Sequence, residues 1–342
     1  MTLWRRQRAG DSSYLIQGEN ITNHVHYHVD ANKAEMERLC ADLVRTEFDK
    51  YSAEAREIIE DRIDEFTSNF LYELSERQPN GLPSLKQPSM QRAIRTAEIE
   101  FATSGDIDLG SVLIDLLIEL SSQTERTVQA VSLNEAISVA PKLSADHLNT
   151  LAILVIVKYM TFHWSSIEEM YSGLSKNLTP VAAPLSSTGM TYRHMQGVGV
   201  GWLGANTEPI PTIFLDRYPG LFNRGAEAYE FPENFPKDLL IPSLRDPQRW
   251  QVPVFSPNFL DQHVSPDNPL YGHGDTIRVF LMANRLSTEE VKLELVEKIP
   301  ELDGVMQTWE NTNMHQFELT STGIAIGHAH LRAKVPGPPL VF

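Results

Sequence analysis

The chain lacks the features that mark several common classes of protein. It has one cysteine in 342 residues, Cys40, which excludes a disulfide framework and a zinc site built from the cysteines of one chain. Its longest apolar run, from Leu151 to Val157, is far shorter than the roughly 20 residues that cross a bilayer. No apolar stretch follows the basic start of the chain, so the sequence predicts no signal peptide, no membrane span and a cytoplasmic protein.

Basic residues are also scarce, and they are unevenly placed. The chain has 29 Lys and Arg against 45 Asp and Glu, a net charge of −16, which disfavours long-range attraction to nucleic acid or anionic lipid. Residues 30–141 contain 22 acids and 11 bases, whereas the first ten residues contain three arginines and no acid. These opposite charges favour contact between the start of the chain and its body, within or between subunits.

What is present indicates a folded, mainly α (α+β) protein. The hydrophobic share of 42% and the charged share of 22% are ordinary for a globular chain, and the length suggests about two domains. Differences in local composition divide the sequence into four segments. These are a β arm for oligomerisation (1–30), a helical domain that forms a bundle (31–178), a segment rich in proline and aromatic residues packed on the body (179–275), and a small C-terminal α+β unit with a loose tail (276–342).

The arm contains two runs of strand-forming residues, Ser13–Gln17 and Ile21–Val29, separated by Gly18, Glu19 and Asn20. A pair of strands is only marginally stable alone, so the arm must pack on the body or on the arm of another subunit. The sequence therefore predicts a homo-oligomer formed through the arm. The residues that we expect to form it are Asp11, Ser13, Ile16, Gln17, Ile21, Val25 and Tyr27.

Apolar residues recur at helical spacing through much of the second segment. Breakers and capping residues place the helix ends. The expected helices are residues 31–51, Ser52 to Gln78, Ser89 to Gly105, Leu109–Leu120 (interrupted only by Asp115 and Glu119), Val128–Val139, and Ser144–Phe162 with Ser144 as its cap.

Proline then interrupts the helical pattern, since 13 of the 21 prolines lie between Pro180 and Pro269. The sequence predicts irregular chain here, and further regular elements after residue 275. The expected elements are a strand at Tyr192–Trp202, a short helix at Ile210–Tyr218, an extended piece at Val252–Phe255, a strand or helix at Thr276–Asn284, a helix capped by Ser287 and Glu290, a turn at Val305–Trp309, a strand at Phe317–Thr320 and a final helix at Gly323–Arg332.

One histidine pattern suggests chemistry. His24, His26 and His28 alternate along the second arm strand, so their imidazoles would share one face and could bind zinc, copper or nickel. The alternative interpretation is a polar strand face, and we predict no bound metal or other cofactor. His328 and His330, two residues apart in a predicted helix, are expected to have a structural role.

Other candidate motifs point to structure rather than catalysis. The glycine-rich run at 197–204 lacks the Lys-Ser/Thr of a phosphate loop, so we interpret it as close backbone approach in a packed strand. No nucleophile signature is found. Arg5, Arg6 and Arg8 form a basic patch beside Trp4 that could touch nucleic acid, lipid headgroups or an acidic partner, or could be a solvated terminus.

Several segments resemble one uncharacterised bacterial protein family. Ala9–Gln17 matches its N-terminal motif Ala-Gly-Asp-x-Ser-x-x-Ile-Gln, and Leu319–Ile326 matches its C-terminal motif Leu-Thr-Ser-x-Gly-Ile-Ala-Ile. Ser104–Leu117, Leu133–Leu143 and Tyr218–Phe222 are similar to its middle. The resemblance covers the whole chain, but it implies no activity and supplies no catalytic residue.

The arm alone is also similar to segments that precede bacterial effector and conflict-system domains, which implies an oligomerising module in defence against phage or mobile elements. Together these observations predict a non-enzymatic, oligomeric scaffold or sensor in the cytoplasm, with a protein partner of unknown identity. One alternative is a metal-dependent hydrolase or nuclease that uses the three arm histidines. Another is a DNA-binding regulator, because Leu319 to Gly323 is similar to the strand and turn that close winged-helix domains.

Overall fold

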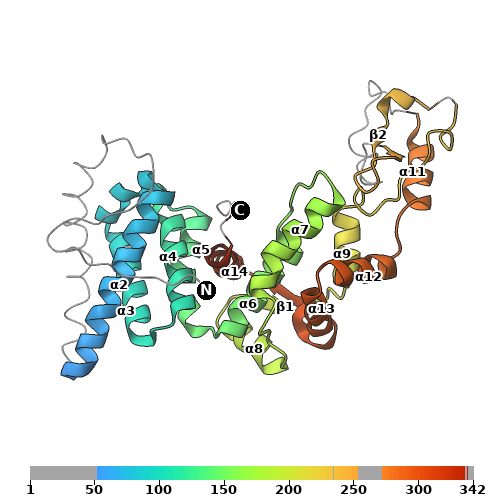
Figure 1. Ribbon diagram of the computed structural model, residues 1–342. Helices are drawn as coiled ribbons and strands as arrows, with labels where there is room; N and C mark the ends of the chain where they lie inside the picture. Colours follow the sequence, from blue (N-terminus) through green and yellow to red (C-terminus); the bar gives the residue numbers. More distant parts are fainter. Residues whose placement is uncertain (1–51, 234, 253–271, 336, 338–342) are drawn as a thin grey trace, which may run out of the picture.

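The computed structural model describes residues 52–233, 235–252, 272–335 and 337. These residues form a mainly α structure with two short antiparallel strand pairs, which confirms the predicted fold class. Figure 1 shows an elongated molecule, with α2 to α5 at one end, α14 and α6 near the middle, and α11 and β2 at the other end. None of the helices in this part of the chain has the length and apolar character that a bilayer span requires.

The first end is a group of four helices whose termini follow the capping residues. They are α2 (Ala53–Arg77), α3 (Pro88–Ser104), α4 (Ile107–Ser121) and α5 (Val128–Val139), with a 3₁₀ segment η2 (Pro79–Lys86) after α2. Ser52, Asp106 and Thr127 each accept a hydrogen bond from a backbone N–H in the first turn of the helix that follows. The predicted cap at Ser89 is wrong, because α3 already begins at Pro88, a residue suited to the first helical position.

The central helices include the clearest difference from the sequence predictions. The elements are η3 (Ala140–Lys142), α6 (Ala145–Leu154), a π-helical continuation η4 (Val155–Tyr159), α7 (Ile167–Leu178), η5 (Thr179–Val181) and α8 (Gly189–Gly197). A strand was predicted from Tyr192, but only β1 (Gly201–Leu203) is extended. Residues 189–197 are helical because Tyr192 and Met195, three residues apart, are both buried on one helix face.

The far end confirms the short predicted helix, α9 (Ile210–Arg217), and adds a small sheet. The remaining elements are η6 (Lys237–Leu239), β2 (Ile241–Pro242), β3 (Trp250–Gln251) and α11 (Gly274–Ala283), so the stretch from Thr276 is a helix. A second hydrophobic cluster, which includes Phe231, Phe235 and Ile277, is packed here. The extended piece predicted at Val252–Phe255 lies almost wholly outside the described residues.

The last part of the chain agrees well with the sequence. Its elements are α12 (Thr288–Lys298), α13 (Glu301–Asn311), η7 (Asn313–Gln316), β4 (Phe317–Leu319) and α14 (Ser321–Lys334). The capping box of Ser287 and Glu290 is confirmed at the start of α12. The turn expected at 305–309 belongs to the longer helix α13. The division into four segments stays a prediction.

Helix α14, the last helix among the described residues, lies between α4 and α5 on one side and α6 on the other (Figure 1). A Cβ added to Gly327 would stand 2.7 Å from the carbonyl oxygen of Leu151 in α6, and one added to Gly323 would overlap the carbonyl oxygen of Val200. Both contacts are to backbone, which a side-chain rotation cannot move aside. The fold therefore requires glycine at both positions of α14.

We predict that Gly323→Ala lowers the free energy of unfolding by about 2 kcal/mol or more, because the methyl group must push α14 away from Val200. The matched control is Gly304→Ala in α13, where an added Cβ meets nothing within 4 Å. There alanine should stabilise by roughly 0.5–1 kcal/mol through its better helix propensity. Urea denaturation of both variants measures this, and equal effects at the two sites would contradict the packing argument.

Candidate functional site

The candidate site residues that the sequence predicted for the arm, for metal binding and for the basic patch all precede Ser52 and lie outside the described residues. These are the arm residues Asp11, Ser13, Ile16, Gln17, Ile21, Val25 and Tyr27, the histidines His24, His26 and His28, and the basic patch Arg5, Arg6 and Arg8. Their roles stay predictions. In the part of the chain that the structure does describe, no group of three or more His, Cys, Asp or Glu side chains could hold a metal ion.

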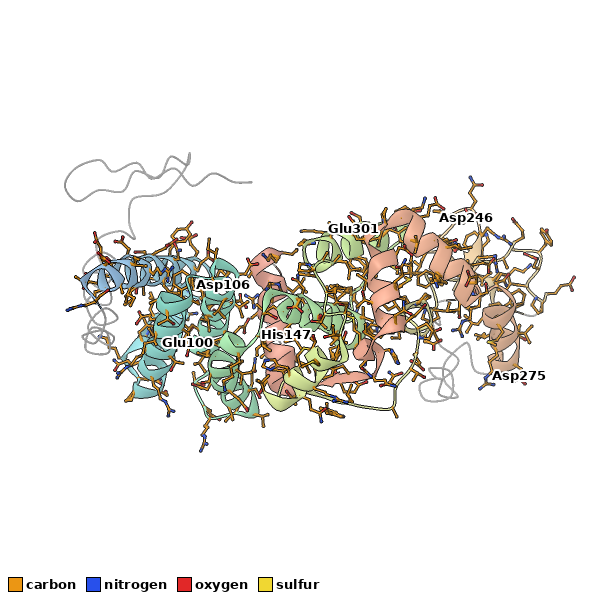
Figure 2. The ribbon with its side chains drawn as sticks, turned by 90° about the horizontal axis from the view of Figure 1, so that it is seen from below. Glu100, Asp106, His147, Asp246, Asp275 and Glu301 are labelled. Atoms are coloured by element: carbon orange, nitrogen blue, oxygen red, sulfur yellow. The ribbon has the colours of Figure 1, made fainter. Side chains whose placement is uncertain are left out.

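A serine, an aspartate and a histidine meet at the first turn of α6, and Figure 2 shows His147 near the middle of the molecule. The backbone N–H of Ser144 donates to His147 Nδ1 at 3.0 Å, so that nitrogen carries no proton. The Ser144 hydroxyl contacts the Asp146 carboxylate, whose other oxygen accepts a 2.6 Å bond from Ser186 Oγ. The bond from Ser144 N to His147 Nδ1 is one half of the capping box at the start of α6, which confirms Ser144 as its cap.

A second imidazole lies beside this cap. The rings of His147 and His194 are 5.2 Å apart, and His194 Nε2 donates to the carbonyl oxygen of Lys142 at 2.8 Å. Burial lowers the pKa of His147, while Asp146 raises it and His194 lowers it. The arrangement joins α8 to the start of α6, which is a structural use of side chains that resemble a catalytic set.

Buried charges join α14 to α4 and α2. Asp115 and Glu119 are both buried on α4. Arg332 of α14 pairs with Glu119, and its Nε lies 3.5 Å from Asp115 Oδ1, which also accepts a 2.5 Å bond from Arg77 of α2. Burial raises the pKa of Asp115, and the two guanidinium groups lower it. Arg332 of α14 and Arg77 of α2 therefore together compensate the two carboxylates of α4.

Two histidines of α14 face the interior, in line with the structural role predicted for them. His328 and His330 are almost fully buried, and His330 Nε2 bonds to Asn149 Oδ1 of α6 at 2.8 Å. Burial lowers the pKa of each to about 4, so both are neutral at physiological pH. Protonation of either would place an imidazolium in an apolar contact surface.

The sheet of β1 and β4 carries an exposed aromatic residue. Trp202 is 49% exposed and lies opposite Glu318, whose carboxylate accepts bonds from Lys158 Nζ at 2.8 Å and Tyr159 Oη at 3.0 Å. A Cβ on Gly201 would stand 2.5 Å from the carbonyl oxygen of Glu318, which confirms the predicted close backbone approach at this glycine. A Cβ on Gly197 or Gly199 would meet nothing within 4 Å, so the prediction is wrong for these two residues of the run. We name Gly201, Trp202 and Leu203 the β1 edge. Sequence reasoning did not find it, because its partner strand is more than 100 residues away.

The outward side of α2 is strongly acidic. The helix contains eight acidic and three basic residues. We name its exposed acids the acidic face of α2: Glu54, Glu57, Glu60, Asp61, Asp64, Glu65 and Glu76. Of the bases, Arg62 donates to the carbonyl oxygen of Ala102 at 2.8 Å and Arg77 is bonded to Asp115. Both guanidinium groups therefore lean toward neighbouring helices and relieve little of the negative charge.

These features define a mainly helical protein in which the last helix is enclosed by earlier ones and the surface offers a sheet edge and an acidic helix. Residues 32–340 match the model of an uncharacterised protein family, and the chain belongs to that family. The match begins after the motif at Ala9–Gln17, and it includes the other resembling segments. Searches of curated proteins and of solved structures found no match.

Removal of Arg332 tests the buried charge network. We predict that Arg332→Met lowers the free energy of unfolding by about 3–5 kcal/mol, since it leaves Glu119 buried without its cation and leaves Asp115 with Arg77 alone. The matched control is Lys298→Met, which removes an exposed pair with Glu297 and should cost at most about 1 kcal/mol. Chemical denaturation at pH 7 distinguishes the two, and a small loss in both would refute the role of the network.

The buried histidines predict acid sensitivity above the range where carboxylates titrate. A pKa of about 4 in the folded state, below the unfolded value of about 6.5, means that the unfolded state binds more protons, so stability falls as pH drops through this window. At pH 5 the free energy of unfolding is lower than at pH 7.5 by about 2 kcal/mol through His328 alone. His328→Leu should remove that part of the slope between pH 7.5 and 5. An unchanged slope in the variant would show that His328 does not contribute.

Proposed function

We propose that this chain is an oligomeric scaffold or sensor in the bacterial cytoplasm, that it catalyses no reaction, and that its assembly serves defence against phage or other mobile elements. The defence role rests on the similarity of the arm to segments of bacterial conflict-system proteins. Assembly rests on physical grounds, since an arm with two predicted strands needs a surface to pack on.

The acidic face of α2 is the observation that carries this proposal. Glu57, Asp61 and Glu65 follow one another at i, i+4 spacing and are all exposed, so like charges repel along the helix surface. The complementary positive charge is at the start of the arm, on Arg5, Arg6 and Arg8. Charge complementarity of this kind guides association and fixes which surfaces meet. We therefore propose that the arm of one copy contacts the acidic face of α2 on another.

Charge reversal tests the proposal in the full chain. Light scattering at 0.15 M salt should show wild-type protein at a multiple of 38.6 kDa. The triple reversal Arg5→Glu, Arg6→Glu and Arg8→Glu should lower the mass toward the monomer, because it removes attraction and adds repulsion. Combining it with Glu57→Arg, Asp61→Arg and Glu65→Arg should restore the oligomer, as expected for sites that couple directly.

The control is an equal number of reversals elsewhere, at the exposed residues Glu289, Glu297 and Asp303. Added to the arm variant, these reversals should not restore the mass, although they change the net charge equally. The proposal would be contradicted if the wild-type chain has the mass of a monomer at all concentrations. It would also be contradicted if the arm reversals leave the mass of the oligomer unchanged.

A further inference from the structure

The two outer edges of the β1–β4 sheet can be told apart by their hydrogen bonds. In an antiparallel pair, alternate residues direct both N–H and C=O to the partner strand. Trp202 is paired with Glu318, and the flanking bonds run from Thr320 N to Val200 O at 3.1 Å and from Gly204 N to Gln316 O at 2.7 Å. Gly201 and Leu203 therefore direct their backbone groups to the opposite side, away from β4.

The outer edge of β4 is covered by side chains. Lys158 Nζ donates to the carbonyl oxygen of Phe317 at 2.9 Å, and Leu319 N donates to Tyr159 Oη at 2.7 Å. Lys158 and Tyr159 form the end of the π-helix after α6, and Arg217 holds that end by donating to the carbonyl oxygen of Met160 at 2.8 Å. Side chains of the π-helix therefore cover this edge of the sheet.

The β1 edge has no such cover among the residues that the structure describes. No hydrogen bond to the N–H or C=O of Gly201 or Leu203 is found there. Gly201 is buried, whereas Trp202 and Leu203 are exposed, so another chain can approach this edge from the Leu203 end. An exposed strand edge is a template for pairing with another chain. The geometry therefore leaves a position for one further strand beside β1.

We propose that the β1 edge receives the predicted strand Ile21–Val29 from the arm of a second copy of this chain. This inference rests on the proposed oligomeric function and names the surface that the arm uses. The added strand would pair with Gly201 and Leu203 and extend the sheet to three strands. Pairing of this kind takes affinity from backbone bonds and specificity from alternate side chains.

The side-chain pattern of the arm strand fits this position. Alternation gives it an apolar face, with Ile21, Val25 and Tyr27, and a polar face that carries the three histidines. The interior face of β1 offers only Gly201, which has no side chain, and Leu203, which is 38% exposed. Apolar residues of the arm strand would add side chains to this face of the sheet, to which β1 itself contributes few. The histidines would then lie on the same face as Trp202 and Glu318.

Chain length separates the two parts of the arm. Arg8 lies 13 residues before Ile21, and an extended segment of that length spans up to about 43 Å. The basic patch can therefore contact a surface at some distance from the strand that pairs with β1.

The test measures hydrogen exchange at the backbone amides of the β1 edge. We would place Val25→Pro and His26→Pro together in the full chain, because two adjacent prolines block the strand whichever residue faces β1, and neither lies in the described body. Hydrogen exchange should become at least about tenfold faster at the amides of Gly201 and Leu203. The amides of Trp202 and Gly204, which face β4, should not change and serve as internal controls.

Leu203→Pro is the reciprocal variant, since it removes an outward N–H and leaves the bonds to β4 in place. It should speed exchange across residues 21–29, whereas Leu203→Ala, which keeps the N–H, should not. Unchanged exchange at Gly201 and Leu203 in the arm variant would overturn the proposal. Light scattering separates the claim that the chain is an oligomer from the claim that the arm pairs with β1. If the chain is an oligomer but exchange at the β1 edge is unchanged, only the pairing site is refuted. If the chain is a monomer, the role of a second copy is refuted.

Discussion

The structure depends on how closely helix α14 approaches the backbone of other elements. Gly327 contacts the carbonyl of Leu151 in α6, and Gly323 contacts that of Val200 just before β1. A side chain at either position would separate the helices. Because α14 also packs on α4 and α5, this one helix joins the first group of helices to the centre of the molecule. Helix α14 therefore completes the hydrophobic core formed with α4, α5 and α6.

The same helix buries groups that are costly to bury. Arg332 pairs with Glu119 and shares Asp115 with Arg77, and His328 and His330 are held neutral inside the contact surface. Such ionic contacts add little net stability compared with apolar packing, but they are strongly destabilising when one partner is missing. Packing α14 in a wrong register would separate Arg332 from both carboxylates. We infer that the network selects one position of α14 between its neighbours.

Local sequence signals predicted much of this fold, and the long-range contacts explain the rest. Ser287 and Glu290 form the expected capping box because both residues lie within one turn. The π-helix after α6 was not predictable, since Arg217, almost 60 residues later, holds its last carbonyl groups. Asp115 and Glu119 interrupt an apolar helix visibly in the sequence, but nothing there identifies Arg332 as their partner. The β1 edge was missed for the same reason, as its strand is defined only by pairing with β4.

The proposed function follows from surfaces rather than from a reactive centre: an acidic helix at one end, an open sheet edge in the middle, and an arm with complementary charge and strand pattern. These surfaces can act together only if α14 holds the first group of helices and the centre of the molecule in one cooperative unit. Native-state hydrogen exchange in increasing urea tests this directly, with amides of α14 compared with those of α4 and α6. The account predicts that all three helices open with the same free energy. Exchange of α14 at a clearly lower free energy than α4 and α6 would contradict it.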